Sequence, residues 1–138
     1  VTESVLSNDL QHTVEQMEAL KAEGFSFSID HFGTGLSCLS SLYEYPVKAL
    51  KVDKSFIDNI VDNDSRLNIV EAIISLAKNL NILVVVEGVE TMRQFETLKT
   101  KGIDTIQGSF IAKPMPLDKY LVWHKQHLSK LPFSNLIF

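Results

Sequence analysis

Asp30 is the first residue of this sequence whose type and position suggest chemistry. Residues 25–30 alternate apolar and small polar side chains, which predicts a strand whose polar face ends in the Asp30 carboxylate. Gly33 and Gly35 follow and predict a turn that a side chain would resist. Catalytic carboxylates of α/β barrels occupy such strand ends, next to loops. A strand-ending aspartate that only caps a turn fits this stretch equally well.

Further predicted strands carry polar side chains near their C-terminal ends. These side chains belong to Lys51, Asp53, Glu87 and Gln107. If helices cover the apolar faces of the strands, these residues and Asp30 lie on the opposite face at one edge of a parallel sheet. Carboxylates crowded together with a lysine cannot all stay ionised unless a cation, or a phosphate that interacts with the lysine, binds among them. The pattern therefore favours a metal or phosphate site over a purely structural polar cluster.

Alternating strands and helices are expected along the chain. The expected strands are residues 25–30, 49–54, 82–87 and 104–110, and the expected helices are 7–21, 36–43, 64–80, 91–102 and 116–128. Asp64 or Ser65 is expected to cap the third helix, and Thr91 with Gln94 predicts a capping box for the fourth. This order predicts an α/β fold with about four parallel strands.

Composition narrows the class of protein. The chain has 138 residues, 45% hydrophobic and 22% charged, which suits one globular core. Its net charge of −4 argues against a DNA or RNA polymer as partner. Cys38 stands alone, so no internal disulfide is expected, and we expect a reducing, cytoplasmic location. No apolar run is long enough for a membrane span, and the start at Val1 suggests a fragment.

Four motifs, in this order and at these separations, resemble the EAL-domain family of cyclic-di-GMP phosphodiesterases. The motifs are Asp30-His31-Phe32-Gly33-Thr34-Gly35, Leu50-Lys51-Val52-Asp53-Lys54-Ser55-Phe56, Glu87-Gly88-Val89-Glu90-Thr91 and Gln107-Gly108. The resemblance runs from Val1 to about Trp123 and covers the later part of a modified TIM barrel of about 250 residues. It implies the second half of such a barrel over residues 1–128, followed by a tail over 129–138.

The resemblance also implies a metal-dependent phosphodiesterase site. Asp30 matches the aspartate that bridges two divalent ions, Mg²⁺ or Mn²⁺, and Asp53 a further carboxylate. Glu87 matches the glutamate that activates water and contacts the second metal. Lys51 matches the lysine near the hydrolytic water. The matched metal positions are Asp30, His31, Asp53 and Glu87, and the matched catalytic positions are Glu87, Lys51 and Gln107.

Two further residues match supporting positions of the family, and the sequence differs from the family pattern at His31 and at the Glu-Ala-Leu signature. Glu3 matches the glutamate that anchors the loop containing Gly33, Thr34 and Gly35, and Glu90 supports the metal site. His31 replaces the family's second aspartate, and its nitrogen suits Mn²⁺ better than Mg²⁺. The family's Glu-Ala-Leu signature belongs to an earlier strand. The Glu-Ala-Leu at residues 18–20 instead lies in a predicted helix, as a solvated face.

The expected activity is hydrolysis of cyclic-di-GMP to linear pGpG by two-metal-assisted attack of water, with the fragment alone inactive. The alternative is a degenerate EAL module that binds cyclic-di-GMP or a partner protein without turnover. A generic phosphate-binding barrel fits the strand pattern but not the motifs. Exposed sheet edges predict a homodimer or pairing with an N-terminal half of the barrel. The parent protein could be membrane-anchored through regions that precede this chain.

Overall fold

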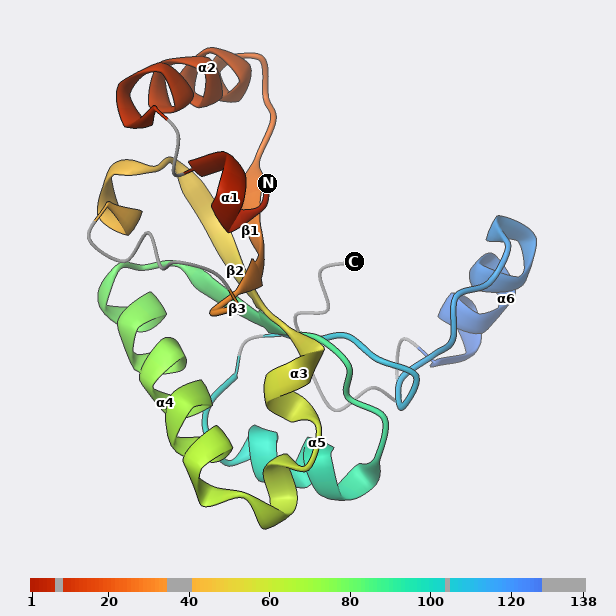
Figure 1. Ribbon diagram of the computed structural model, residues 1–138. Coiled ribbons are helices and arrows are strands. Elements are labelled where there is room, and N and C mark those ends of the chain that lie inside the picture. Colours follow the sequence, from red (N-terminus) through yellow and green to blue (C-terminus); the bar gives the residue numbers. More distant parts are fainter. Residues whose placement is uncertain (7–8, 35–40, 104, 128–138) are drawn as a thin grey trace.

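The structure is a computed structural model that describes residues 1–6, 9–34, 41–103 and 105–127. Its centre is one parallel sheet in the order β1-β2-β3-β4, which confirms the predicted α/β class (Figure 1). The strands are β1 (Phe27–Phe32), β2 (Val47–Val52), β3 (Leu83–Val86) and β4 (Thr105–Ile106). The helices are α1 (Glu3–Leu6), α2 (Leu10–Ala22), α3 (Lys54–Ile57), α4 (Asp64–Asn79), α5 (Met92–Lys99) and α6 (Leu117–His127), with short 3₁₀ turns at Leu42–Glu44 and Ile60–Asp62.

The apolar face of the sheet is the core of the protein. Ile29 and Leu50 are fully buried, as their alternation with polar residues predicts, and Val86 in the apolar run of β3 is fully buried as well. The helices α4 and α5 lie on the side of the sheet that these residues face (Figure 1). The α4 residues buried in the core are Val70, Ile73, Ile74 and Ala77. The opposite face therefore carries the polar side chains toward the C-terminal edge.

The N-terminal residues extend the sheet beyond β1. The backbone N–H of Asp30 donates to the carbonyl of Val1 at 2.6 Å, and Thr2 forms a parallel bridge with Asp30. The terminal ammonium of Val1 also donates to the carbonyl of Ser28 at 2.9 Å. These contacts fix the start of α1, and they place Glu3 beside the loop that follows β1.

Several element boundaries differ from the sequence prediction. The first long helix begins at Leu10, capped by Asp9, and α1 was not expected. Asn63, rather than Asp64 or Ser65, caps α4 by accepting from the Arg66 N–H. Asparagine with an extended backbone is as good a cap as aspartate or serine, and it stands one residue earlier. β4 is only two residues long, because the chain turns at Gly108.

The capping box of Thr91 and Gln94 is confirmed at the start of α5. α6 is also confirmed, although none of its residues is buried and it extends away from the sheet (Figure 1).

Some predictions fall outside the described residues. These concern Gly35, Cys38, most of the expected helix at 36–43 and the tail at 129–138, so the division at residue 128 stays a prediction. None of the helices in the described ranges combines the length and apolar character that crossing a bilayer requires.

At Gly108 the loop after β4 approaches the loop after β3 so closely that a side chain does not fit. A Cβ at this position would overlap the carbonyl oxygen of Val89 and lie 2.5 Å from its amide nitrogen. We expect Gly108→Ala to lower the free energy of unfolding by about 2–3 kcal/mol in urea titrations, because backbone atoms must move apart.

Gly24→Ala is the matched control for this substitution. Gly24 has φ of +94° and open space around its Cβ position, so alanine there costs only backbone strain, about 1 kcal/mol. Equal losses for the two variants would contradict the close approach of the two loops.

Candidate metal centre

Lys51 connects two carboxylates at the C-terminal edge of the sheet. It lies on β2 between β1 and β3, and its Nζ is 3.3 Å from Oδ1 of Asp30 and 2.5 Å from Oε1 of Glu87. Burial would lower the pKa of Lys51, but the hydrogen bond and charge of Glu87, then those of Asp30, outweigh it and raise that pKa. Burial would likewise raise the pKa of Asp30, and Lys51 reverses this and lowers it. The predicted convergence of these three residues is present.

His31 has a left-handed backbone, with φ of 55°, which turns the chain sharply after Asp30. The hydroxyl of Thr34 donates to the His31 carbonyl at 2.8 Å and holds this turn. The imidazole Nδ1 is 2.7 Å from Oδ2 of Asp53, and Nε2 is 3.8 Å from Oδ2 of Asp30. The histidine ring therefore lies between two carboxylates.

Asp53 follows β2, and its carboxylate forms hydrogen bonds with two residues. Its Oδ1 accepts from the Ser55 N–H at 2.8 Å, which caps α3, while Oδ2 contacts His31. The hydrogen bonds from His31 and then Ser55 lower the pKa of Asp53 to about 2. The hydrogen bond with Asp53 and then the charge of Asp30 raise the pKa of His31. The two carboxylates therefore favour the protonated form of the His31 ring, and the ring favours the ionised form of Asp53.

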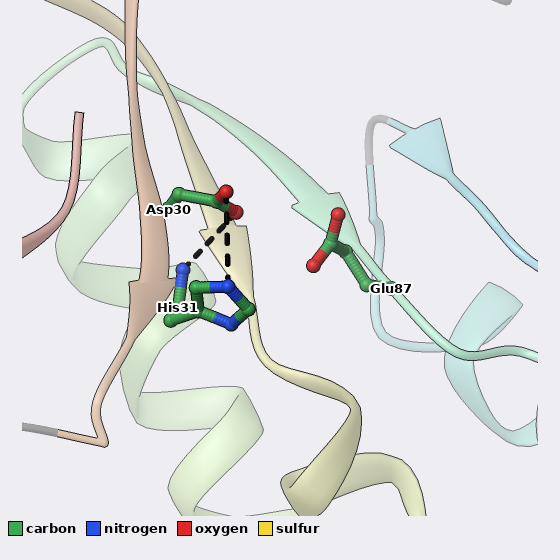
Figure 2. Close-up of side chains that lie close together, drawn as sticks. All are labelled: Asp30, His31 and Glu87. Carbon is green, nitrogen blue, oxygen red and sulfur yellow. Dashed lines mark hydrogen bonds and ion pairs between the residues drawn. The ribbon is translucent and has the colours of Figure 1, made fainter.

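Asp30, His31 and Glu87 form a group that could hold a metal ion. One ligand atom from each residue lies within 4.8 Å of the others (Figure 2). Figure 2 shows the Asp30 carboxylate and the His31 ring side by side on β1, and the Glu87 carboxylate approaching from the end of β3. Two carboxylates with one imidazole suit a divalent first-row ion. Asp53, a predicted metal position, lies beside this group and contacts it through His31.

Glu3 contacts the loop that follows β1. Its side chain is buried, and Oε1 accepts from the Gly33 N–H at 3.0 Å. Gly33 has φ of +93°, and a Cβ there would lie 3.0 Å from the ring of Phe56. This geometry holds the loop start in one conformation, although its importance for function stays a prediction. Gly35, also predicted to belong to this loop, lies outside the described residues.

Lys54 makes contacts beside the site that were not predicted from the sequence. Its Nζ lies 2.6 Å from Oε1 of Glu90, and its stem covers Gly88, where a Cβ would lie 2.6 Å from the Lys54 Cβ. The hydrogen bond with Glu90 raises the pKa of Lys54. The two residues thus clamp the loop that begins at Glu87. Lys54 belongs to the motif at residues 50–56, but an exposed lysine gives no local signal for this contact.

Gln107 follows β4 and lies apart from the lysine contacts. Its backbone N–H donates to the Val86 carbonyl at 2.8 Å, which continues the pairing of β3 and β4. Its side chain lines a cavity of about 500 Å³ together with Gly88, Lys113 and Trp123. Within the described residues, the polar contacts of Lys51 and His31 do not include Gln107. Its predicted catalytic role stays a prediction.

The comparisons with known proteins assign the family. The EAL domain model matches residues 1–114, and the chain belongs to the EAL domain family. The cyclic di-GMP phosphodiesterase NbdA of Pseudomonas aeruginosa is 42% identical over 117 residues, which are 85% of this chain and 15% of NbdA. The chain therefore spans a small part of the length of this curated relative.

Solved structures give the same fold. The structure of the MucR phosphodiesterase of Pseudomonas aeruginosa with c-di-GMP matches with a TM-score of 0.82 and 39% identity, over 87% of this chain and 49% of that one. The manganese and cyclic-di-GMP complex of Klebsiella pneumoniae BlrP1 matches with a TM-score of 0.76 and 32% identity, over 83% of this chain and 29% of that one. The parallel sheet of this chain is thus part of an EAL fold, which is TIM-barrel-like.

The pairing of His31 with Asp53 predicts a defined pH dependence. The raised pKa of His31 stabilises the fold fully below its unfolded value of 6.5, and this contribution is lost as pH rises through the folded pKa. The lowered pKa of Asp53 stabilises above 3.8, and this contribution is lost as pH falls toward about 2. Asp53→Asn should therefore lower the melting temperature more at about pH 5.5 than at about pH 9, in buffer containing a chelator.

Asparagine preserves the cap of α3, so the substitution isolates the charge of Asp53. Proton NMR titration should show the His31 pKa moving toward 6.5 in Asp53→Asn. Asp118→Asn, at an exposed carboxylate in α6, is the control. A His31 pKa that is the same with and without the Asp53 charge would contradict the pairing.

Proposed function

We propose that the domain to which this chain contributes hydrolyses cyclic-di-GMP to linear pGpG by metal-assisted attack of water. The observation that carries the proposal is the contact of Lys51 with both Asp30 and Glu87 at the C-terminal edge of the sheet. Relatives in the same family are named as cyclic di-GMP phosphodiesterases, and related structures contain c-di-GMP. Catalytic groups of barrel enzymes occupy this edge.

The residues have separate tasks in this proposal. Asp30, His31 and Glu87 would hold Mg²⁺ or Mn²⁺, and their carboxylate and imidazole donors fit a divalent ion. Such an ion, when bound, makes water more acidic and neutralises phosphate oxygens. Glu87 accepts the proton of the attacking water. Lys51 places a positive charge next to the negative charge that develops on the phosphate.

A non-catalytic module is the second candidate, and His31 favours it. This residue stands where the family pattern has an aspartate, and its ring pairs with Asp53 instead of leaving two free carboxylates. Such a module would bind cyclic-di-GMP or a partner protein without turnover. For either function we propose that the chain pairs with a second copy or with the preceding half of a barrel. The described sheet ends at the Thr2 bridge to Asp30 on one side and at the short β4 on the other, and both edges are open to pairing.

Glu87→Gln tests the catalytic proposal. The protein for this test is the 138-residue chain joined to the preceding half of the MucR domain, assayed with cyclic-di-GMP and Mn²⁺ by nucleotide chromatography. Removal of the proton acceptor should reduce turnover about 100-fold or more. Glu96→Gln, at an exposed residue of α5, should keep full turnover. The 138-residue chain alone should show no turnover, because two ions need more ligands than its described residues bring together.

Two results would reject the catalytic proposal. Undiminished turnover in Glu87→Gln would remove Glu87 from the reaction. A joined protein that binds cyclic-di-GMP in calorimetry but does not hydrolyse it with Mn²⁺ or Mg²⁺ would instead establish the non-catalytic module.

A further inference from the structure

We propose that the metal position beside His31 is a mixed nitrogen and oxygen site that selects Zn²⁺ and similar first-row ions over Mg²⁺. His31 Nε2, Asp30 Oδ2 and a carboxylate oxygen of Glu87 are its ligands, and Asp53 orients the histidine ring without binding the ion. This inference rests on the proposed metal site and adds the ion that the site prefers.

The contact with Asp53 determines which ring nitrogen can bind a metal. Nδ1 of His31 is 2.7 Å from Oδ2 of Asp53. A carboxylate only accepts hydrogen bonds, so Nδ1 carries a hydrogen, and in the neutral ring that can bind a metal the lone pair lies on Nε2. Metal-binding histidines are commonly held in this way, with one nitrogen on a carboxylate and the other on the ion.

Asp53 is itself fixed and is poorly placed to be a ligand. Its Oδ1 accepts from the Ser55 N–H at 2.8 Å at the start of α3, and its Oδ2 is used by His31. It is also absent from the group whose ligand atoms lie within 4.8 Å of one another. The sequence resemblance predicted Asp53 as a metal position, whereas these contacts favour a role in orienting His31.

Nε2 of His31 faces the second oxygen of Asp30. The distance from Nε2 to Oδ2 is 3.8 Å, which is too long for a hydrogen bond. Two ligand atoms that each lie about 2.1 Å from one zinc ion are about 3.4 Å apart in tetrahedral geometry. An ion between them therefore needs only a small adjustment. Lys51 contacts the other oxygen, Oδ1, so the lysine and an ion can use Asp30 together.

The backbone at residue 31 supports this arrangement. The left-handed conformation, with φ of 55°, places the ring next to the Asp30 carboxylate (Figure 2). The Thr34 hydroxyl and the Thr34 N–H both donate to the His31 carbonyl, at 2.8 and 3.3 Å, and hold this turn. Aspartate also tolerates a left-handed backbone, so His31→Asp changes the donor atom with little change in backbone strain.

The donor set explains the preference for one kind of ion. Mg²⁺ favours an octahedral shell of oxygen atoms and keeps much of its water. Zn²⁺ accepts imidazole nitrogen and carboxylate oxygen with few ligands, and three protein ligands are common where a position stays open for water. Replacing an aspartate oxygen with an imidazole nitrogen therefore moves the preference from Mg²⁺ toward Zn²⁺.

Calorimetric titration of the 138-residue chain with Zn²⁺ and with Mg²⁺ tests the proposal. The chain should bind Zn²⁺ at least about 100-fold more tightly than Mg²⁺. His31→Asp should reduce this ratio about 10-fold or more. Asp53→Asn should weaken Zn²⁺ binding about 10-fold to 100-fold through the ring orientation, and should leave Mg²⁺ binding nearly unchanged. His12→Asp, the same substitution at an exposed histidine of α2, should leave the ratio unchanged.

Nitrogen-15 NMR of the histidine rings identifies the ligand atom directly. Added Zn²⁺ should shift Nε2 of His31 while Nδ1 keeps its hydrogen. Equal Zn²⁺ to Mg²⁺ ratios in the chain and in His31→Asp would overturn the proposal, as would a Zn²⁺ shift at Nδ1 or no binding of Zn²⁺. Circular dichroism of each variant identifies a loss of folding.

These readouts separate the inference from the proposed activity. A joined protein that fails to hydrolyse cyclic-di-GMP rejects the catalytic proposal, while selective Zn²⁺ binding through Nε2 still supports the site. Hydrolysis that runs with Mg²⁺ in a protein whose His31 ring does not respond to Zn²⁺ keeps the activity and rejects the mixed site.

Discussion

The contact of Lys51 with Asp30 and Glu87 is the interaction on which this edge of the protein depends. Three neighbouring parallel strands place one charged side chain each at their C-terminal ends, and two of the three are carboxylates. Two unit charges about 4 Å apart interact with about 4 kcal/mol at a partly buried protein surface. The ammonium between the two carboxylates turns this repulsion into attraction. The strands can therefore pair in register with all three side chains charged.

The same constraint supports the proposal that the site acts on a phosphodiester. Lys51 uses one oxygen of Asp30, and the other oxygen faces His31. The C-terminal edge of the sheet thus carries the positive charge of Lys51 next to the pair formed by Asp30 and His31. In the proposed function, a divalent ion and a negatively charged phosphate would balance the charges of these groups together. Two contacts fix the loops around these groups. Glu3 binds Gly33 in the loop after β1, and Lys54 binds Glu90 in the loop after β3.

Local patterns predicted the sheet and the position of its polar residues. Strict alternation in residues 25–30 and 49–54 was enough to place Ile29 and Leu50 in the core and Lys51 on the other face. A capping box is likewise local, and the one at Thr91 is confirmed. The resemblance of the motifs to the EAL family predicted the fold, which the family match and the related structures confirm.

Features that depend on contacts between distant segments could not be predicted in this way. The left-handed backbone of His31 and its pairing with Asp53 depend on the end of β1 and a helix start 22 residues apart. The Lys54 clamp on Glu90 spans 36 residues. The short β4 ends close to where Gly108 approaches Val89, and α1 begins beside the bridge between Thr2 and Asp30. None of these leaves a periodic signal in the sequence.

Melting of Lys51→Met with and without Mn²⁺ tests most directly whether Asp30 and Glu87 form one site that requires a cation. We expect this variant to melt about 3 °C or more below the unaltered chain in chelator, because its two carboxylates lose their counter-ion. Added Mn²⁺ should then raise the melting temperature more in Lys51→Met than in the unaltered chain. Lys48→Met, at an exposed lysine of the same strand, should behave like the unaltered chain. Equal melting temperatures in chelator and equal Mn²⁺ shifts for Lys51→Met and the unaltered chain would show that Asp30 and Glu87 do not depend on a shared cation.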